Sequence, residues 1–408
     1  MDAKNKIPTN CPENGIECPR CKCGVSLIFE SGTSLPAFQW DGATWAVDQL
    51  HSAAEFAFVT HAHFDHLPVS PNRDAAAPPP TFATRLTRAI FAARGSQVPA
   101  GNDWDLEKIG APGAAGIEFT GILSGHMEGA ASIVTASVES GASMFYAGEF
   151  FPVSRPHLPA LVPQPTTTLV IESTYGHPNW NHPPTGSAER DLHEIVEGLS
   201  ATGPAVVAGD IGGKMPRIVD VLADLNLPFI VPPEFAREWQ VLQEWYGISE
   251  SADSPVEETN TGGDNPTAGE DPSGSSPVIY TRSQLRGAKG KAIRDQAIYL
   301  VPPSALKTGR GGVQDFPDAP AVLCSGQVLD PAYRTEYPAS AYVPLRDHPT
   351  YTELLAFIKE CHPEDVWVLP GEDHALCWAV RHELGIECNP LALPRADGMP
   401  RLPQLFFA

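Results

Sequence analysis

The seven residues at positions 60–66, Thr-His-Ala-His-Phe-Asp-His, place three imidazoles and a carboxylate directly after an apolar segment. That segment, 56–59, predicts a short buried strand. A turn at its end would direct the first two histidines to one side and Asp65 and His66 to the other, an arrangement that suits two adjacent metal ions. We call residues 60–66 the His-rich turn. Imidazole and carboxylate ligands favour zinc over calcium or magnesium. The alternative to a metal site is that residues 60–66 form a solvated, His-rich loop.

Other candidate metal ligands stand at the ends of predicted strands or in the turns after them. Strands are predicted at 25–29, 44–47, 132–135 and 143–147, and 125–129 is typical of a tight loop that presents one imidazole. Because strand ends meet at the edge of a sheet, we expect these side chains to converge. The set is Asp48, His61, His63, Asp65, His66, His126, Glu149, Glu172 and His348.

From Leu169 onward, the pattern alternates between strands and helices. A helical stripe at 192–199 follows Ser187, a good N-cap residue, and a buried strand is predicted at 205–208. This order predicts a parallel sheet covered by helices. Residues 249–277 are dominated by Ser, Asp, Glu, Gly, Pro and Thr, so we expect a disordered surface insertion there.

The chain length and the N-terminal region limit the classes of protein to which the sequence can belong. A chain of 408 residues is longer than one hydrophobic core usually supports, so we expect two domains or one elaborated domain. The first thirty residues contain neither a basic start followed by an apolar run nor a membrane-spanning segment. We therefore expect a soluble, cytoplasmic protein with no membrane partner.

The net charge of −22 argues against a polyanionic partner, but the basic residues are unevenly distributed. Seven of the 27 basic residues fall between 282 and 310, where Asp295 is the only acid. This stretch is a candidate phosphate track, with a solvated face as the alternative. The residues expected to contact nucleic acid are Arg282, Arg286, Lys289, Lys291 and Arg294.

Half of the eight cysteines lie close together near the N-terminus, at Cys11, Cys18, Cys21 and Cys23. Four thiolates within such a short stretch are a candidate structural zinc site. The spacing is irregular, so disulfides and free thiols remain alternatives. The other four cysteines are scattered and are expected to be core residues.

These motifs, taken in order, resemble the metallo-β-lactamase superfamily and, within it, the β-CASP nucleases. The matching segments are 46–48, the His-rich turn, 125–126, Leu-Val-Ile-Glu-Ser-Thr-Tyr-Gly at 169–176 (motif A), Arg-Asp-His-Pro-Thr-Tyr at 346–351 (motif B) and 368–372, where motif C is expected. The resemblance spans 44–383. Ligase-associated DNA exonucleases look most similar, with RNA 3′-end processing nucleases and ribonuclease J close behind.

The resemblance implies an α/β fold, with an αββα sandwich at 25–175 and 340–408 and an inserted parallel α/β cap at 176–339. The Cys-rich segment 1–24 lies outside it. The family would place one zinc on His61, His63 and His126, a second on Asp65 and His66, and Glu149 between them. Asp48 would orient ligand imidazoles, and Glu172 and His348 would flank the scissile phosphate. Two zinc ions about 3.5 to 4 Å apart would make hydroxide available near neutral pH.

Two positions depart from the family pattern. Glu149 stands where members usually have Asp, and the extra methylene shifts a bridging carboxylate. Pro370 stands where RNA-processing members have a metal-binding histidine in motif C. DNA-repair members also lack that histidine, so Pro370 favours DNA, although His374 could substitute if the loop turned back.

The sequence therefore predicts a zinc-dependent nuclease, with DNA exonuclease favoured over RNA processing. A DNA ligase or a processing complex is the expected protein partner. A small-molecule hydrolase of the same superfamily and an inactive scaffold that binds nucleic acid or partner nucleases are the alternatives. Asp65, His348, Glu172 and Asp48 are the residues expected to take part in catalysis.

Overall fold

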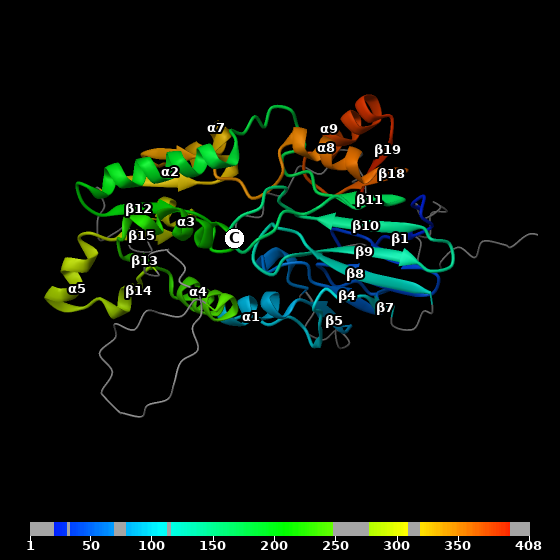
Figure 1. Ribbon diagram of the computed structural model, residues 1–408, viewed down its shortest axis with the longest axis horizontal. Coiled ribbons are helices and arrows are strands. Elements are labelled where there is room, and N and C mark those ends of the chain that lie inside the picture. Colours follow the sequence, from blue (N-terminus) through cyan, green and yellow to red (C-terminus); the bar gives the residue numbers. More distant parts are fainter. Residues whose placement is uncertain are drawn as a thin grey trace, which may run out of the picture. The chain divides into compact units, whose positions relative to one another are not determined.

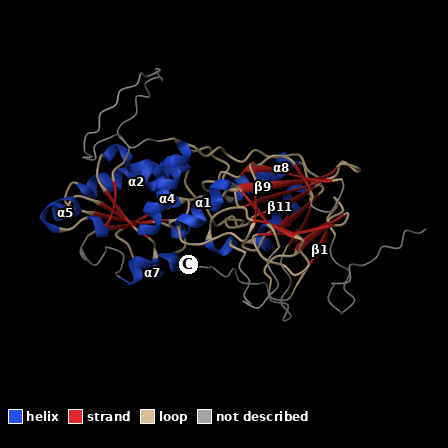
Figure 2. Ribbon diagram, turned by 90° about the horizontal axis from the view of Figure 1, so that it is seen from below, coloured by secondary structure: helices blue, strands red, loops and turns tan. Residues whose placement is uncertain are grey.

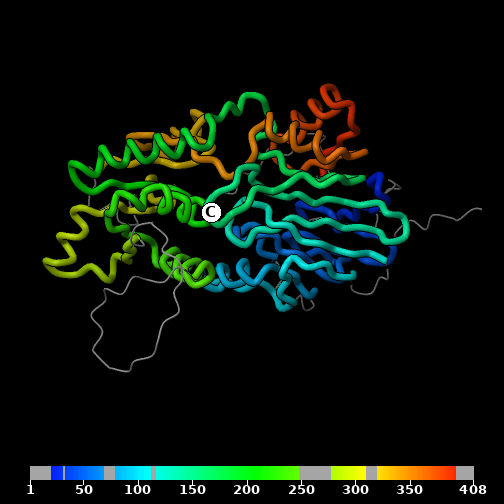
Figure 3. The backbone as a smooth tube through the Cα atoms, viewed as in Figure 1, coloured from blue at the N-terminus to red at the C-terminus, as the bar shows by residue number. Residues whose placement is uncertain are grey.

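The computed structural model describes residues 20–30, 33–68, 79–111, 116–247, 277–308 and 319–391. Cys11, Cys18 and residues 249–276 of the predicted insertion lie outside them. The described residues form two compact units, one from 20–30, 33–68, 79–111, 116–187, 325–333 and 344–391 and the other from 188–247, 277–308, 319–324 and 334–343. Figure 3 follows this course, in which the blue and red parts of the chain belong to the first unit and the yellow part to the second.

The first sheet of the first unit has the spatial order β1-β2-β3-β4-β5-β6. The strands from β1 to β3 are antiparallel, and those from β3 to β6 are parallel. Their bounds are β1 (Ser26–Ile28), β2 (Ala37–Trp40), β3 (Ala43–Val47), β4 (Phe56–Phe58), β5 (Thr81–Ala83) and β6 (Gly101–Asp103). The turn η1 (Phe64–His66) follows β4, and helix α1 (Arg85–Ala93) follows β5.

The second sheet of this unit has the order β19-β18-β11-β10-β9-β8-β7 (Figure 1). The strands from β7 to β10 are antiparallel, whereas β10, β11, β18 and β19 are parallel. Their bounds are β7 (Ile109–Gly110), β8 (Ile117–Leu123), β9 (Ala131–Ser137), β10 (Ser143–Gly148), β11 (Thr168–Ile171), β18 (Asp365–Val368) and β19 (Glu387–Pro390).

Alternate residues of each strand point to opposite faces of its sheet. The apolar inner faces of the two sheets pack against each other. In β10, Met144 and Tyr146 point into the core between the sheets, where they join residues of the first sheet. Aromatic rings fill this core: Trp45 meets Phe119 edge to face, with ring centroids 5.1 Å apart. The apolar runs of the sequence therefore form strands because each run can bury side chains on its inner face.

The outer face of the second sheet is covered by helices α8 (Tyr351–Cys361) and α9 (Asp373–Ala379), the latter extended by the π-helical turn η6 (Val380–Leu384). Phe145 and Ala147, the alternate residues of β10, face these helices. Thr350 and Glu353 form a capping box that begins α8 at the last residue of motif B, Tyr351.

The second unit contains one parallel sheet with the order β14-β13-β15-β12-β16-β17. Helices lie on both sides of its strands (Figure 2). The strands are β12 (Ala205–Ala208), β13 (Phe229–Val231), β14 (Ile279–Thr281), β15 (Ile298–Val301), β16 (Ala321–Cys324) and β17 (Ala341–Val343). The helices of this unit are α3 (Lys214–Leu222), η2 (Ala223–Leu225), α4 (Pro233–Tyr246), η3 (Arg282–Gln284), α5 (Gly287–Arg294) and α6 (Ser304–Thr308). Helices α2 (Thr185–Ser200) and α7 (Pro331–Glu336) belong partly to each unit, and η5 (Gly326–Leu329) belongs to the first.

The predicted α/β class is confirmed, and a parallel sheet forms as the alternating pattern indicated. The N-cap expected at Ser187 is wrong, because α2 already begins at Thr185. The hydroxyl of Ser187 donates to the Pro184 carbonyl instead, and the two prolines before the helix preset its first turn. The named αββα sandwich and the domain boundaries stay predictions. Within the described residues, no helix has the length and apolar character needed to cross a membrane.

One buried carboxylate joins the N-terminal segment to the second sheet. Asp365, at the start of β18, is 2% exposed. It accepts hydrogen bonds from Thr168 Oγ1 (2.5 Å), Trp367 Nε1 (2.8 Å) and the Lys22 amide (3.1 Å). Three donors offset the cost of burying the charge.

Replacement of Asp365 by Asn should lower the free energy of unfolding by about 1–3 kcal/mol, because one acceptor oxygen becomes a donor in a site that holds only donors. Urea denaturation measures the change. Asp103→Asn is the control, since Asp103 is exposed and pairs with Arg88 at the surface; we expect about 0.5 kcal/mol or less there. Equal losses in the two variants would contradict the prediction.

Candidate metal centre

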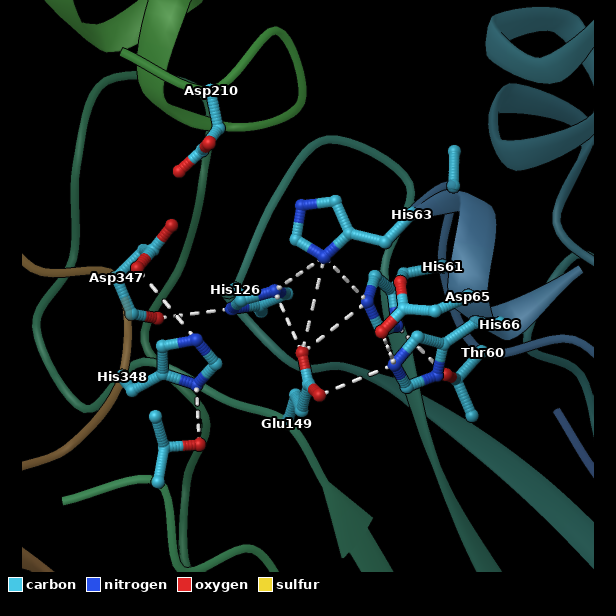
Figure 4. Close-up of polar contacts among 12 residues, drawn as sticks. Thr60, His61, His63, Asp65, His66, His126, Glu149, Asp210, Asp347 and His348 are labelled. Atoms are coloured by element: carbon cyan, nitrogen blue, oxygen red, sulfur yellow. Dashed lines mark hydrogen bonds and ion pairs between the residues drawn. The ribbon is translucent and has the colours of Figure 1, made fainter. Parts of the chain in front are cut away.

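The predicted ligands stand where strands of the two sheets end. Asp48 follows β3, the His-rich turn follows β4, and Glu149 follows β10. His126 lies in the loop between β8 and β9. Figure 4 shows the carboxylate of Glu149 in the middle of this group, with imidazoles on both sides of it.

Three histidines point their ring nitrogens at one another. His61 Nε2 lies 2.9 Å from His63 Nδ1, which lies 3.3 Å from His126 Nε2. Glu149 Oε2 is 3.3 Å from the first and 3.1 Å from the last of these nitrogens. In a tetrahedral zinc site with metal–nitrogen distances of 2.0–2.1 Å, ligand atoms are about 3.3 Å apart. His63 Nδ1 lies farther from Glu149 Oε2, at 3.9 Å. These four side chains could therefore hold a single metal ion.

The other oxygen of Glu149 faces a different set of donors. Glu149 Oε1 lies 3.2 Å from His66 Nε2, and Asp65 Oδ2 lies 3.7 Å from the same nitrogen. Asp48, His61 and His66 also form a group whose ligand atoms are all within 4.8 Å. Glu149 thus has the position of a bridging carboxylate, with one oxygen toward each group.

A contact network fixes the ring of His61 in one orientation. Asp48 accepts hydrogen bonds from the Thr60 amide and the Thr60 hydroxyl, both at 2.7 Å. The Thr60 oxygen lies 2.9 Å from His61 Nδ1. If that ring nitrogen donates to Thr60, the Nε2 lone pair faces His63, His126 and Glu149. Asp48 also lies 2.9 Å from His66 Nδ1, as expected of a residue that orients imidazoles.

Thr60 and Asp347 are site residues to which sequence reasoning assigned no role. His126 Nδ1 donates to the Asp347 carbonyl over 3.0 Å, which leaves Nε2 toward the other histidines. The sequence signal for Thr60 was its place directly before the first histidine. The signal for Asp347 was its place in motif B, but a carbonyl contact between residues 221 positions apart has no sequence pattern.

Burial and charge set the protonation of these groups. Burial, helped by the His66 charge, lowers the pKa of His61 to about 4. Burial and the charges of His61 and His126 lower the pKa of His63 well below its usual range. Burial opposes the charged form of His66, but Glu149 and Asp48 raise its pKa well above the usual value. His61 and His63 are therefore neutral at pH 7, as metal ligands must be.

Glu172 and His348 form a buried pair beside this group. Glu172 Oε2 lies 2.8 Å from His348 Nδ1, and Glu172 Oε1 accepts from the Phe150 amide at 3.0 Å. Burial acts to lower the pKa of His348, but the Glu172 carboxylate raises it to about 9. The His348 ring centroid is 4.7 Å from that of His126. His348 therefore holds a positive charge at the edge of the centre.

The predicted cysteine site lies only partly within the described residues. Cys21 and Cys23 are buried in the core between the sheets, and their thiols are hydrogen-bonded to each other. Burial and that bond raise the pKa of Cys21, with the hydrogen bond as the larger cause. No donor group found in the described part of the chain includes either cysteine, so the zinc assignment there stays a prediction.

The predicted nucleic-acid contacts lie in the second unit, on η3 and α5. Arg282, Arg286, Lys289 and Lys291 are exposed. Arg294 is partly buried, and its guanidinium donates to the Leu285 carbonyl. Pro370 and His374 are both exposed, and neither joins a donor group of the described residues.

No family model matches the chain. A protein named probable DNA ligase from Opitutus terrae is 24% identical over 389 residues, which cover 91% of this chain and 33% of that protein. The chain thus spans about a third of that relative's length. A crystal structure of a protein of unknown function from Enterococcus faecalis V583 has a TM-score of 0.49 and 14% identity, and covers 82% of this chain and 78% of that chain.

Proposed function

We propose that the chain is a zinc-dependent phosphodiesterase that hydrolyses DNA, and that it is a β-CASP nuclease of the metallo-β-lactamase superfamily. One observation supports this most strongly: the Glu149 carboxylate lies within 3.3 Å of His61, His126 and His66 ring nitrogens, with one oxygen toward each side. Such a set suits two divalent ions and few other chemical tasks.

The six donor residues would bind the two zinc ions, which would supply the charge that catalysis needs. His61, His63 and His126 would hold one zinc, Asp65 and His66 the other, and Glu149 both. Bound zinc supplies the Lewis acidity that ionises water near neutral pH and stabilises charge on the phosphoryl group.

His348 would act on the leaving group of the phosphodiester. Glu172 occupies its Nδ1, while its Nε2 lies 3.7 Å from Asp347 Oδ1, beyond hydrogen-bond distance. The Nε2 proton is therefore available to the leaving oxygen, and Glu172 keeps the ring charged.

DNA is the favoured nucleic acid for two reasons. Pro370 cannot supply the motif C histidine of RNA-processing relatives, and the name of the relative from Opitutus terrae refers to DNA. Exonuclease action follows the sequence resemblance, with RNA processing as the second candidate. The close approach of five of the six donors weighs against an inactive scaffold; the sixth, Asp65, lies 3.7 Å from His66 Nε2 and is half exposed.

His63→Ala should abolish most metal binding and activity, because it removes the ring that faces both His61 and His126. Wild-type protein should hold about two zinc ions per chain, measured by mass spectrometry of the metal content. End-labelled single- and double-stranded DNA and RNA measure cleavage, with and without a chelator. His374→Ala, an exposed histidine outside the donor groups, is the control. Cleavage that survives both His63→Ala and the chelator would reject the metal mechanism.

Glu172→Gln should lower kcat by about 10²–10⁴-fold, the usual range for loss of acid–base catalysis, without loss of zinc. The reason is that Glu172 binds His348 rather than the donor group around Glu149. Steady-state kinetics and metal analysis on the same sample separate the two effects. His126, Asp347 and His348 form a further group that could hold a metal, so zinc loss in His348→Ala would instead identify His348 as a ligand.

Replacement of Arg282, Arg286, Lys289 and Lys291 by Gln should weaken DNA binding and reduce its salt dependence. Each lost contact with a duplex phosphate should lower the slope of log K against log salt by about 0.9. Fluorescence anisotropy with the His63→Ala protein measures binding without cleavage. The control variant replaces four exposed bases outside this stretch, namely Arg85, Lys108, Arg190 and Lys359. Equal slopes in the two variants would show that the basic stretch is only a solvated face.

A further inference from the structure

Three aromatic rings lie together at the end of motif A and in the loop that follows it. Tyr175 is buried, whereas Trp180 and His182 are partly exposed. The ring centroid of Tyr175 is 5.1 Å from that of Trp180 and 4.3 Å from that of His182. The ring planes of Trp180 and His182 differ by only 12°. We call Tyr175, Trp180 and His182 the aromatic platform.

Polar and steric contacts fix the rings of the aromatic platform. Trp180 Nε1 donates to Glu372 Oε1, which belongs to the motif C segment, over 3.4 Å. His182 Nε2 donates to the Gly326 carbonyl over 2.9 Å. A Cβ at Gly326 would overlap the Tyr175 hydroxyl oxygen, so the Tyr175 ring fits here because position 326 is glycine. The platform is therefore held to two other segments of the first unit.

The aromatic platform adjoins His348. The Tyr175 ring meets the His348 ring edge on, with centroids 5.8 Å apart and an interplanar angle of 87°. One buried ring thus lies in contact with both Trp180 and His348. In the proposed function, His348 gives its Nε2 proton to the leaving oxygen. Only a sugar separates that oxygen from the base of the leaving nucleotide, so this base has to lie near His348.

The first unit otherwise keeps most of its tryptophans in the core. The buried ones are Trp40, Trp45, Trp104 and Trp367. Trp378, on α9, is 58% exposed and stacks on His382, with ring centroids 4.5 Å apart. Trp180 combines partial exposure with a link through one ring to the proposed acid. A flat indole face at such a place suits a nucleobase, because bases stack on aromatic side chains whatever their sequence.

We propose that the aromatic platform binds the base of the leaving nucleotide, which stacks on Trp180, and that this contact positions the scissile phosphodiester against His348. The inference rests on the proposed function and adds a substrate-binding residue to it. Trp180 contacts the base and no zinc ligand. Stacking uses the flat face of the base and not its hydrogen-bonding edges, so the platform accepts all four bases.

The test uses end-labelled single-stranded DNA in which one nucleotide lacks its base, and it compares the cleavage rates of the bonds on its two sides. Wild-type protein should cut the bond that releases the abasic nucleotide as leaving group about 5–150-fold more slowly than the same bond in intact DNA. The bond on its other side should be slowed less. Trp180→Ala should slow cleavage of intact DNA by a similar factor, without further slowing at the abasic nucleotide and without loss of zinc.

Trp378→Ala is the matched control, because it removes another exposed tryptophan that stacks on a histidine in the same unit. It should cut intact and abasic DNA as the wild-type protein does. Trp180→Phe, which keeps a flat ring, should retain more activity on intact DNA than Trp180→Leu, which keeps only an apolar side chain.

Two results would overturn the aromatic platform and leave the proposed function intact. One is cleavage by the wild-type protein that does not depend on the missing base. The other is equal slowing of intact and abasic bonds by Trp180→Ala, which would mark Trp180 as a structural residue. Should that variant fail to fold, equal rates for Trp180→Phe and Trp180→Leu on intact DNA would overturn the platform. Absence of metal-dependent cleavage by the wild-type protein would overturn both the platform and the proposed function.

Discussion

The crowding of ligand atoms around Glu149 is the interaction on which the rest of the site depends. Burial raises the pKa of this carboxyl, but the His66 charge and hydrogen bonds from His126 and His61 lower it well below its usual range. The group is therefore a half-buried anion among imidazoles. Such an anion needs positive charge nearby, and the imidazoles that meet it can accommodate either a proton or a metal ion. The surrounding fold therefore holds the imidazoles beside Glu149, where they can bind either a proton or a metal ion.

Strand topology explains how distant residues reach that point. β3 and β4 are parallel neighbours in one sheet, and β10 and β11 are parallel neighbours in the other. Neighbouring parallel strands have their carboxyl ends at the same edge of a sheet. The side chains that follow these strands therefore lie close together, although they are far apart in the sequence. The edge-to-face contact of Trp45 with Phe119 is one of the contacts that hold the two sheets together. A core made of ordinary aromatic contacts thus determines where the polar residues meet.

Part of this was predictable from the sequence for a physical reason. The histidines of the His-rich turn and the strand before it are local in sequence, and periodicity reports local structure well. The start of α2 was missed because two prolines outweighed the propensity of Ser187 to cap. Contacts such as Arg94 with the Ala62 carbonyl were beyond sequence reasoning, because a surface-like arginine at the end of a helix shows no sign of the loop that will cover it. For the same reason, the residues that hold the ligand-bearing loops were harder to predict from the sequence than the ligands themselves.

The glutamate at position 149 illustrates how backbone geometry can compensate for side-chain length. Pairing of β10 with β11 shifts register between Tyr146 and Gly148, so that one extra residue lies in β10 just before Glu149. Gly148 has φ +61°, and a Cβ there would lie 2.9 Å from the Tyr146 ring. A bulge of this kind re-aims the side chain that follows it. Because the Glu149 oxygens still lie 3.1–3.3 Å from three ring nitrogens, the additional methylene does not carry the carboxylate past the centre, and the longer side chain is no argument against two-metal binding.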